Sequence, residues 1–286
     1  MKFNMKQKQA WTGVLFISPW IVGFFVLVAY PLYKTIYMSF HNVSYGNKSG
    51  WSYSWAGVEN YTRILFEDVD FIVEAQDFFV TTILYVPVII ALSIIIAMLL
   101  NQKIKGTAFF RLLFFLPIII LNGELMENMS TYGGMSISAN KVILDMIYTI
   151  IPYENIVVLI VSIFDLIVQL LWYSAVPILI FLAALQKINK DMYEAASIDG
   201  ASAWTSFWKI TLPTIYPLVS LCVVFIVVFL GNFDANPINS MILESKYDGS
   251  RRDGYSSAMA ILYSFIQVLL ISILFLATRS RKSRRN

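Results

Sequence analysis

The sequence predicts an all-α membrane protein in which six transmembrane helices form one domain over residues 1–286, with both termini in the cytoplasm. Three observations predict this fold: the composition, the length of the apolar blocks and the placement of Lys and Arg. Hydrophobic residues make up 58% of the chain and charged residues only 14%, and the mean hydropathy is +0.68. This composition is too apolar for an ordinary water-soluble domain, so we expect lipid to be the solvent.

The apolar residues form blocks long enough to cross a membrane, since a helix of about 20 residues spans about 30 Å of hydrocarbon. The predicted spans are residues 11–37, 78–100, 109–126, 156–185, 210–231 and 255–277. We expect the first span to be retained rather than cleaved as a signal peptide, because its apolar run is long and no cleavage motif of small residues precedes the next polar loop.

Basic residues predict the orientation, because Lys and Arg in short loops tend to stay on the cytoplasmic side. With the N-terminus inside, the N-terminal segment, the loops near 103–111 and 187–209 and the C-terminal tail hold fourteen Lys and Arg residues but three acidic residues. An even number of spans then places the C-terminus inside as well. We expect the basic tail at 279–285 to contact anionic lipid headgroups rather than nucleic acid.

Several classes of site are excluded by counting the residues that they need. Cys222 is the only cysteine and His41 the only histidine, so neither an intramolecular disulfide nor a cysteine- or histidine-rich metal site can form. The sequence also lacks a glycine-rich phosphate loop with its Lys and Ser or Thr. We therefore expect no catalytic residue, metal or cofactor on this chain.

The loop at 187–209 is the most informative stretch of the sequence. Asp191 and Glu194 favour a helix start, because carboxylates accept hydrogen bonds from the free amides of a first turn. Ala195 and Ala196 then favour helix. Gly200 is placed to end that helix in a left-handed conformation, which costs other residues more.

A second helical stretch then leads through Trp204 and Trp208 to Leu212-Pro213, where the next span begins or bends. The loop is thus predicted to form a helix, a turn and a helix along the cytoplasmic face. The residues alone leave two interpretations open. The loop is either a docking element for another protein, with Glu194 and Asp199 as charged contacts, or an interfacial helix held by its tryptophans.

The pattern Glu194-Ala195-Ala196, Gly200, Ile210 and Leu212-Pro213 resembles the EAA motif of ABC importer permeases at every position. In that family the element is the coupling helix, which inserts into a groove of the cytoplasmic ATPase subunit. The resemblance implies that this chain couples to an ATPase through Glu194, Ala195, Ala196, Asp199, Gly200, Leu212 and Pro213.

Weaker motifs in the same order resemble the carbohydrate-uptake branch of that family. They are Ser18-Pro19, Tyr30-Pro31, Ser39-Phe40, the stretches 57–61 and 106–111, and Leu116-Pro117. The segment 130–155 matches no family pattern. The resemblance implies a permease subunit of the bacterial inner membrane that forms half of a pathway for a sugar or oligosaccharide. Its implied partners are a second, similar permease, an ATPase dimer that binds ATP and Mg²⁺, and an extracellular substrate-binding protein.

Polar residues near the spans are candidates for the substrate pathway, because an ionisable group within a span is costly unless it has a function. Asp165 and Gln169 lie one helical turn apart, and Asp165 either faces the pathway or sits at the membrane interface. Aromatic rings such as Trp172 stack on sugars, and side-chain amides and carboxylates bind sugar hydroxyls. The candidate pathway residues are Asn122, Glu124, Asp165, Gln169, Trp172 and Asn232.

Other functions remain open at this stage. A secondary transporter driven by protons or sodium is favoured by several buried acids and internal repeats, whereas Asp165 stands nearly alone. An intramembrane enzyme needs clustered catalytic residues, which the spans lack. An ABC permease for another solute, such as a glycerol phosphate ester, is a further alternative. For the polar loop 41–77 we expect an interfacial helix followed by a turn, at the place where a binding protein docks.

Overall fold

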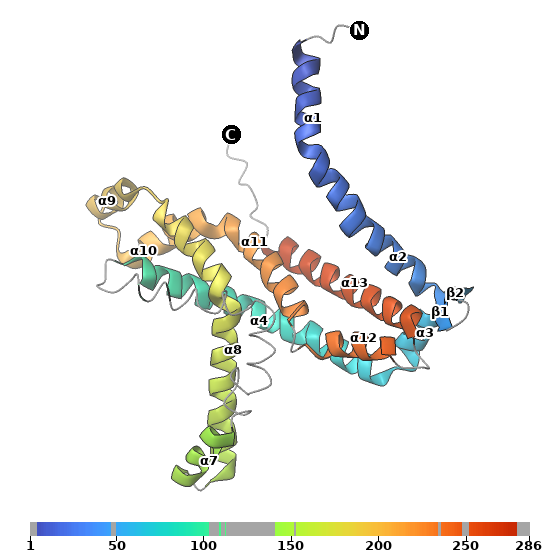
Figure 1. Ribbon diagram of the computed structural model, residues 1–286. Coiled ribbons are helices and arrows are strands. Elements are labelled where there is room, and N and C mark those ends of the chain that lie inside the picture. The colour runs from blue at the N-terminus through green and yellow to red at the C-terminus, as the bar shows by residue number, and fades with distance from the viewer. Residues whose placement is uncertain are drawn as a thin grey trace. The chain divides into compact units, whose positions relative to one another are not determined.

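A computed structural model describes residues 5–46, 50–102, 109, 112, 141–151, 153–233, 236–247 and 252–278 (Figure 1). The chain divides into two compact units. Unit 1 comprises Met1–Ala75 and Pro237–Phe265, and unit 2 comprises Gln76–Asn236 and Ile266–Asn286. Two long helices, α4 (Val69–Asn101) and α13 (Arg252–Thr278), belong partly to each unit. The units are described separately below.

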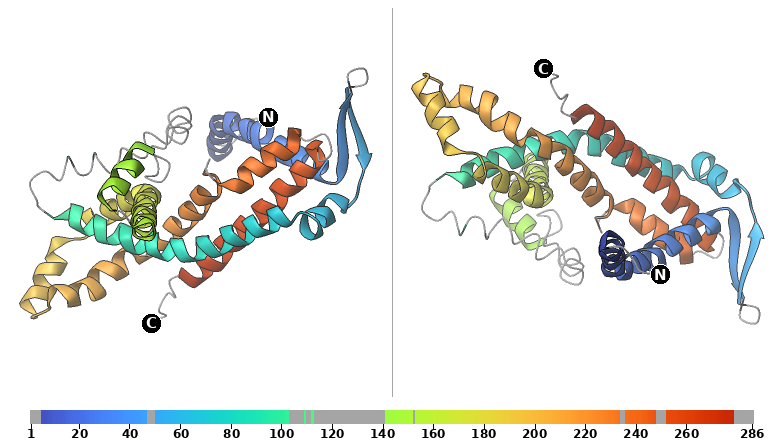
Figure 2. Two further views of the ribbon diagram at one scale, coloured as in Figure 1. Left: turned by 90° about the horizontal axis from the view of Figure 1, so that it is seen from below. Right: turned by 90° about the horizontal axis from the view of Figure 1, so that it is seen from above.

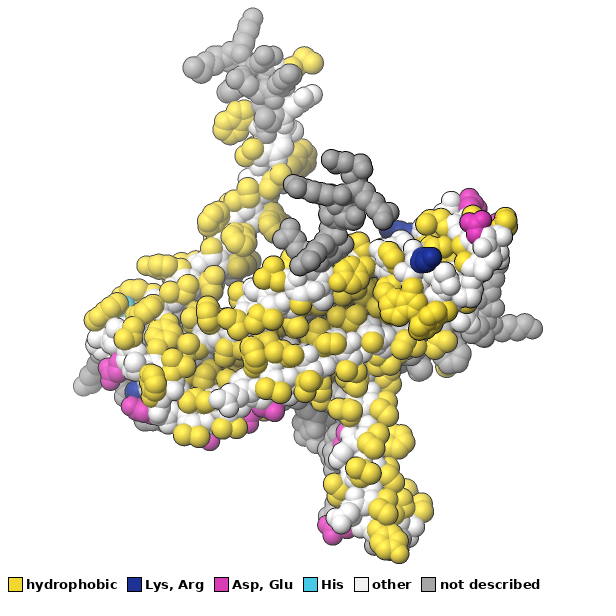
Figure 3. All heavy atoms as spheres, turned by 180° about the vertical axis from the view of Figure 1, so that it is seen from behind, with side chains coloured by type: hydrophobic (Ala, Val, Ile, Leu, Met, Phe, Trp, Pro, Cys, Tyr) yellow, Lys and Arg dark blue, Asp and Glu magenta, His cyan; other side chains and the backbone are white. Residues whose placement is uncertain are grey.

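Five helical segments in the described residues are long and apolar enough to cross a membrane: Trp11–Ser39, Val69–Asn101, Glu154–Gln186, Ala203–Gly231 and Asp253–Thr278. They correspond to five of the six predicted spans. The predicted span 109–126 lies outside the described residues except for Phe109 and Leu112. Hydrophobic side chains cover most of the helix surface on the face drawn in Figure 3, as expected of helices solvated by lipid.

In unit 1 the first span is nearly continuous. It consists of α1 (Met5–Phe24), a π-helical turn (Phe25–Ala29) and α2 (Tyr30–Ser39). Pro31 stands just after the π-helical turn, in a helix that continues from it, where its ring lacks the N–H that would donate to the preceding turn. A π-helical turn widens the helix locally and thereby absorbs a change of register between α1 and α2.

A β-hairpin follows α2, so the expectation of a wholly helical chain is wrong here, and a helix in the loop 41–77 begins only at Glu59, after the hairpin. Strand β1 (His41–Gly46) pairs antiparallel with β2 (Gly50–Trp55), from His41 opposite Trp55 to Gly46 opposite Gly50. The physical reason is visible in β2, where Trp, Tyr and Trp alternate with serines. That period of two fits a strand and not a helix.

The hairpin is followed by α3 (Glu59–Phe66) and the start of α4, and α12 (Pro237–Tyr247) precedes α13. Ile64, Phe71, Ile238 and Met259 are fully buried in this unit. The buried Asp68 joins two elements, because its carboxylate accepts hydrogen bonds from the N–H of Phe71 at 3.2 Å and from the hydroxyl of Tyr255 at 2.7 Å.

Unit 2 contains the rest of α4, α7 (Lys141–Ile150), α8 (Glu154–Gln186), α9 (Lys190–Ile198), α10 (Ala203–Ser206), a π-helical turn (Phe207–Thr211), α11 (Leu212–Gly231) and the end of α13. Helices α8 and α11 pack together. Ile178 and Phe181 of α8 and Ile215 and Ile226 of α11 are completely buried. The loop singled out in the sequence therefore connects two helices that share a core.

Candidate coupling site

The first helix of the loop, α9, begins one residue earlier than predicted. Its N-cap is Asn189, whose side-chain oxygen accepts a hydrogen bond from the N–H of Asp191 at 3.1 Å. The Asn189 amide also donates to the Asp191 carboxylate at 3.1 Å. The prediction that Asp191 starts the helix is thus corrected, because an asparagine just outside the first turn meets the free N–H groups directly.

Gly200 ends α9 as predicted. Its φ is +77°, in the left-handed region. The Gly200 N–H donates to the carbonyl of Ser197 at 3.1 Å, and the Ala201 N–H donates to the carbonyl of Ala196 at 2.8 Å. These two bonds form a Schellman motif, which satisfies the last carbonyls of the helix.

The second helix begins directly after this turn. The hydroxyl of Ser202 accepts from the N–H of Thr205 at 3.2 Å and caps α10. The chain continues through the π-helical turn into α11, and Pro213 lies in the first turn of α11 with Leu212. The rings of Trp204 and Trp208 meet edge to face, with centroids 5.6 Å apart. The predicted succession of helix, turn and helix is confirmed.

The α9 helix presents its side chains to the surroundings. Glu194, Ala195, Asp199 and Gly200 are exposed, Ala196 is partly exposed, and no residue of α9 is buried. Ile198 next to the turn is 87% exposed. A Cβ added at Gly200 meets no atom within 4 Å. The EAA residues thus form an open surface with two carboxylates and small side chains, on which another protein can seat closely.

A hydrogen bond links α9 to Thr211, the last residue of the π-helical turn, which is called the base of α11 below. The hydroxyls of Tyr193 and Thr211 lie 2.8 Å apart, and Thr211 is buried. An open pocket of about 410 Å³ lies beside α9, lined by Met98, Asn101, Gln102, Leu185, Tyr193, Ser197, Ala201, Ala203, Ser206, Phe207 and Thr211. Sequence reasoning missed Tyr193, because only the fold brings it to a residue 18 positions away.

The pathway candidates on α8 lie along one part of the helix. Asp165 and Trp172 are partly exposed and Gln169 is exposed, and the Gln169 amide donates to the Tyr173 hydroxyl at 2.8 Å. Tyr173 itself is buried edge to face against Phe229. Asp165 is 21 residues before the end of α8 at Gln186. Measured along the helix axis, Asp165 therefore lies about 32 Å from the end of α8 where the coupling loop begins.

The remaining candidates lie elsewhere. Asn122 and Glu124 are outside the described residues. Asn232 caps α11, since its amide donates to the carbonyl of Val228 at 2.8 Å, and the Asn236 amide donates to the carbonyl of Leu230 at 3.3 Å. Because Asn232 is exposed, its side-chain oxygen is accessible while its nitrogen closes the helix end.

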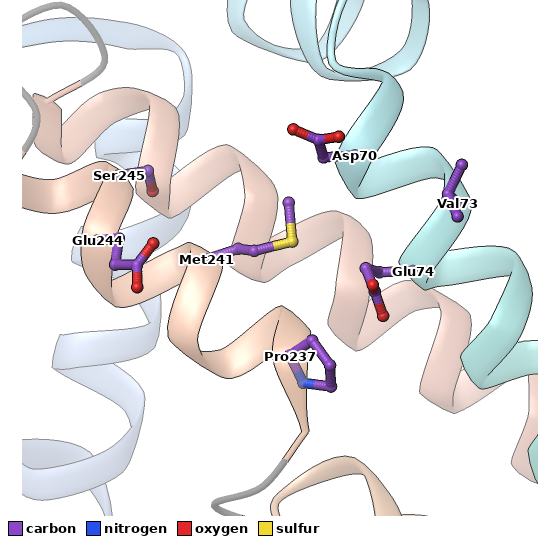
Figure 4. Close-up of a pocket in the computed structure, with 7 residues that line it drawn as sticks. All are labelled: Asp70, Val73, Glu74, Pro237, Met241, Glu244 and Ser245. Carbon is purple, nitrogen blue, oxygen red and sulfur yellow. The ribbon is translucent and has the colours of Figure 1, made fainter. Parts of the chain in front are cut away.

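Unit 1 contains a cleft of about 440 Å³ between α4 and α12, shown in Figure 4. Asp70 and Glu74 extend from α4, and Glu244 from α12. Met241 and Pro237 supply apolar walls. This part of unit 1 therefore has an acidic surface, in contrast to the uncharged strands of the hairpin.

Comparison with known proteins places the chain in a family. No protein-family model matches it. The sequence is 30% identical to the multiple sugar-binding transport system permease protein MsmF of Streptococcus mutans, and the match covers 92% of this chain and 93% of that protein. The chain belongs to the ABC transporter permease family.

The permease is also 29% identical to the probable ABC transporter permease protein YesP of Bacillus subtilis, over 94% of this chain and 91% of that protein. A solved bacterial ABC transporter involved in the import of the acidic polysaccharide alginate contains a chain with the same fold. The TM-score is 0.69 at 18% identity, and the match covers 96% of the permease and 98% of that chain. The permease is thus a multi-pass protein of the bacterial inner membrane.

Proposed function

We propose that this permease forms half of the transmembrane pathway of an ATP-driven importer for a sugar or an oligosaccharide. The observation that carries the proposal is the EAA loop, folded as an exposed helix and a left-handed glycine turn between two helices that pack together. The sugar assignment is supported by relatives named for transport of multiple sugars, lactose and trehalose or maltose, at 30%, 26% and 28% identity.

The proposed assembly contains a second, similar permease, an ATPase dimer that binds ATP and Mg²⁺, and an extracellular substrate-binding protein. One structure with the same fold is a bacterial alginate ABC transporter in complex with an alginate-bound periplasmic protein. That likeness supports the last of these partners. The permease supplies no catalytic group to this assembly, and hydrolysis of ATP takes place in the ATPase.

The geometry of the loop suggests how the ATPase moves the spans. An ATPase seated on α9 pulls on both ends of the loop at once, because α9 continues from α8 and α10 leads into α11. The bond between Tyr193 and Thr211 makes α9 move with the base of α11. The open pocket beside α9 leaves room for that movement. Displacement of the loop therefore changes how α8 and α11 pack.

We further propose that the solute meets polar groups of unit 2. Gln169 and Asn232 each use an amide nitrogen in a hydrogen bond within the protein and keep an oxygen that can accept from a sugar hydroxyl. Asp165, Trp172 and, outside the described residues, Asn122 and Glu124 complete the proposed set. A second solute class is suggested by the osmoprotective compounds uptake permease protein GgtC of Synechocystis, at 25% identity.

The coupling proposal is tested by reversing the charge on α9. Glu194→Lys should weaken docking of the ATPase, so that uptake and substrate-stimulated ATP hydrolysis fall together and less ATPase co-purifies with the permease. Glu154→Lys is the matched control, because Glu154 is exposed in the first turn of α8 and distant in sequence from the loop. Normal uptake and normal co-purification of the Glu194 variant would remove the loop from the coupling mechanism.

A further inference from the structure

The β-hairpin has one aromatic face and one polar face. Residues that lie directly opposite each other in an antiparallel pair share a face. The register therefore puts Trp51, Tyr53 and Trp55 of β2 on the same face as His41 and Val43 of β1. Asn42, Ser52 and Ser54 point to the other face.

The base of the aromatic face is fixed to the end of the first span. The ring of His41 stacks on Tyr37 with centroids 4.1 Å apart, and Trp55 stacks on Phe40 at 6.1 Å. The imidazole Nδ1 of His41 also lies 2.7 Å from the Tyr37 carbonyl. Because these contacts join β1 and β2 to α2, the hairpin keeps a set position relative to the span.

The aromatic side chains of β2 on this face are exposed, whereas His41 and Val43 of β1 on the same face are buried. Trp51 is 50% exposed, Tyr53 39% and Trp55 73%. The hairpin begins two residues after the end of α2 at Ser39, and it projects from that end in both views of Figure 2. The first span is itself unburied along its apolar stretch. The exposed apolar surface of the first span ends at α2, and the aromatic face of the hairpin begins at that same end.

Charge separates this face from the rest of unit 1. Between Thr35 and Val58 the sequence has no acidic residue, and its only Lys or Arg is Lys48. The acidic side chains in the described part of the unit stand outside the hairpin, namely Glu59, Glu67, Asp68, Asp70, Glu74, Glu244 and Asp253. Trp and Tyr rings favour the level of lipid headgroups, whereas the carboxylates suit water or a protein partner.

We propose that the hairpin is a lipid anchor, whose aromatic face lies among the headgroups of the leaflet where α2 ends. The serine face then points toward water. The anchor fixes the depth of the first span and restrains its tilt, as interfacial aromatic residues do. This inference goes beyond the proposed transport function, because it depends neither on the solute nor on the ATPase.

The experiment is a spin-label scan along β2 in the complete transporter. Cys222 is first replaced by Ser, and single cysteines at positions 51 to 55 are labelled after reconstitution into phosphatidylcholine vesicles. Labels at Trp51, Tyr53 and Trp55 should collide more often with oxygen, which concentrates in lipid, than with a water-soluble nickel complex. Labels at Ser52 and Ser54 should show the reverse, so that accessibility alternates with a period of two.

A second measurement keeps the native fold nearly intact. Trp51→Phe and Trp55→Phe should each reduce the part of the tryptophan emission that lipids brominated near the headgroup quench. Equal water accessibility at all five labelled positions would overturn the proposal. So would protection of the aromatic positions only when the soluble binding protein is added, because the occupant would then be that protein.

Discussion

At Gly200, the backbone conformation of the turn can be tested separately from side-chain contacts. Because an added Cβ at this position meets no atom within 4 Å, its requirement for glycine comes from the φ of +77° and not from crowding. Gly200→Val should disfavour the turn by about 1–2 kcal/mol, because a β-branched side chain strains the left-handed conformation. The spans should still insert, while uptake falls relative to ATP hydrolysis.

The matched control is Gly200→Asn, since asparagine tolerates the left-handed conformation better than other non-glycine residues. Uptake and ATP hydrolysis are measured for both variants in proteoliposomes with the full transporter. Equal loss in both would mean that the side chain itself obstructs a partner. Equal retention would show that the turn is not needed.

Tyr193 offers a second test at the residue scale, because its hydroxyl is the link between α9 and the base of α11. Tyr193→Phe should lower the solute transported per ATP hydrolysed, and a hydrogen bond of this kind contributes about 0.5–1.5 kcal/mol. Thr211→Val should act in the same way. In a double-mutant cycle the double variant should be no worse than either single variant. Additive losses would mean that the two hydroxyls act separately.

Sequence reasoning reached the coupling residues but not their support. Gly200 and the EAA residues follow from local rules, since the glycine turn needs only its own backbone conformation. Asn189 could also have been predicted locally, because asparagine is a common capping residue before a helical run. The carboxylate of Asp191 favours a helix start two residues later. Tyr193 and Thr211 carried none, because their bond exists only once α9 folds back over the start of α11.

At the scale of elements, the five described spans could be predicted because apolar length is enough to specify a membrane helix. Their ends were harder to place. Helix α4 begins at Val69 rather than 78, because the charged turns before the membrane continue the same helix. Helices α7 and α12 are short and mixed in composition, and the hairpin carries a period of two within only six residues of β2.

The packing of α13 against the hairpin gives a prediction for these elements. A Cβ at Gly254 would clash with the carbonyl oxygen of His41, so only glycine lets the start of α13 approach the start of β1. Gly254→Ala should lower the thermal unfolding midpoint of the purified transporter, because overpacking costs about 1–3 kcal/mol. Gly23→Ala is the control, since Gly23 lies in α1 with no atom near an added Cβ. An unchanged midpoint for Gly254→Ala would contradict this contact.

At the scale of the whole molecule, the orientation of the coupling loop decides the number of spans. With that loop in the cytoplasm, α8 runs inward and α11 outward, and α13 brings the C-terminus inside. The positive N-terminus predicts that the first span runs outward, which would place the end of α4 at Asn101 inside. If α8 begins on the other side, a further crossing is needed between them, and the span predicted at 109–126 would supply it.

This topology predicts opposite labelling at the end of α4 and the start of α8. In the Cys222→Ser background, a cysteine at the exposed Tyr153 should react with a membrane-impermeant maleimide in intact cells, and one at the exposed Gln102 should react only after lysis. Lys246 should behave like Tyr153, and Lys187 like Gln102. Labelling of Gln102 and Tyr153 from the same side would leave five spans, and the two termini would then lie on opposite sides of the membrane.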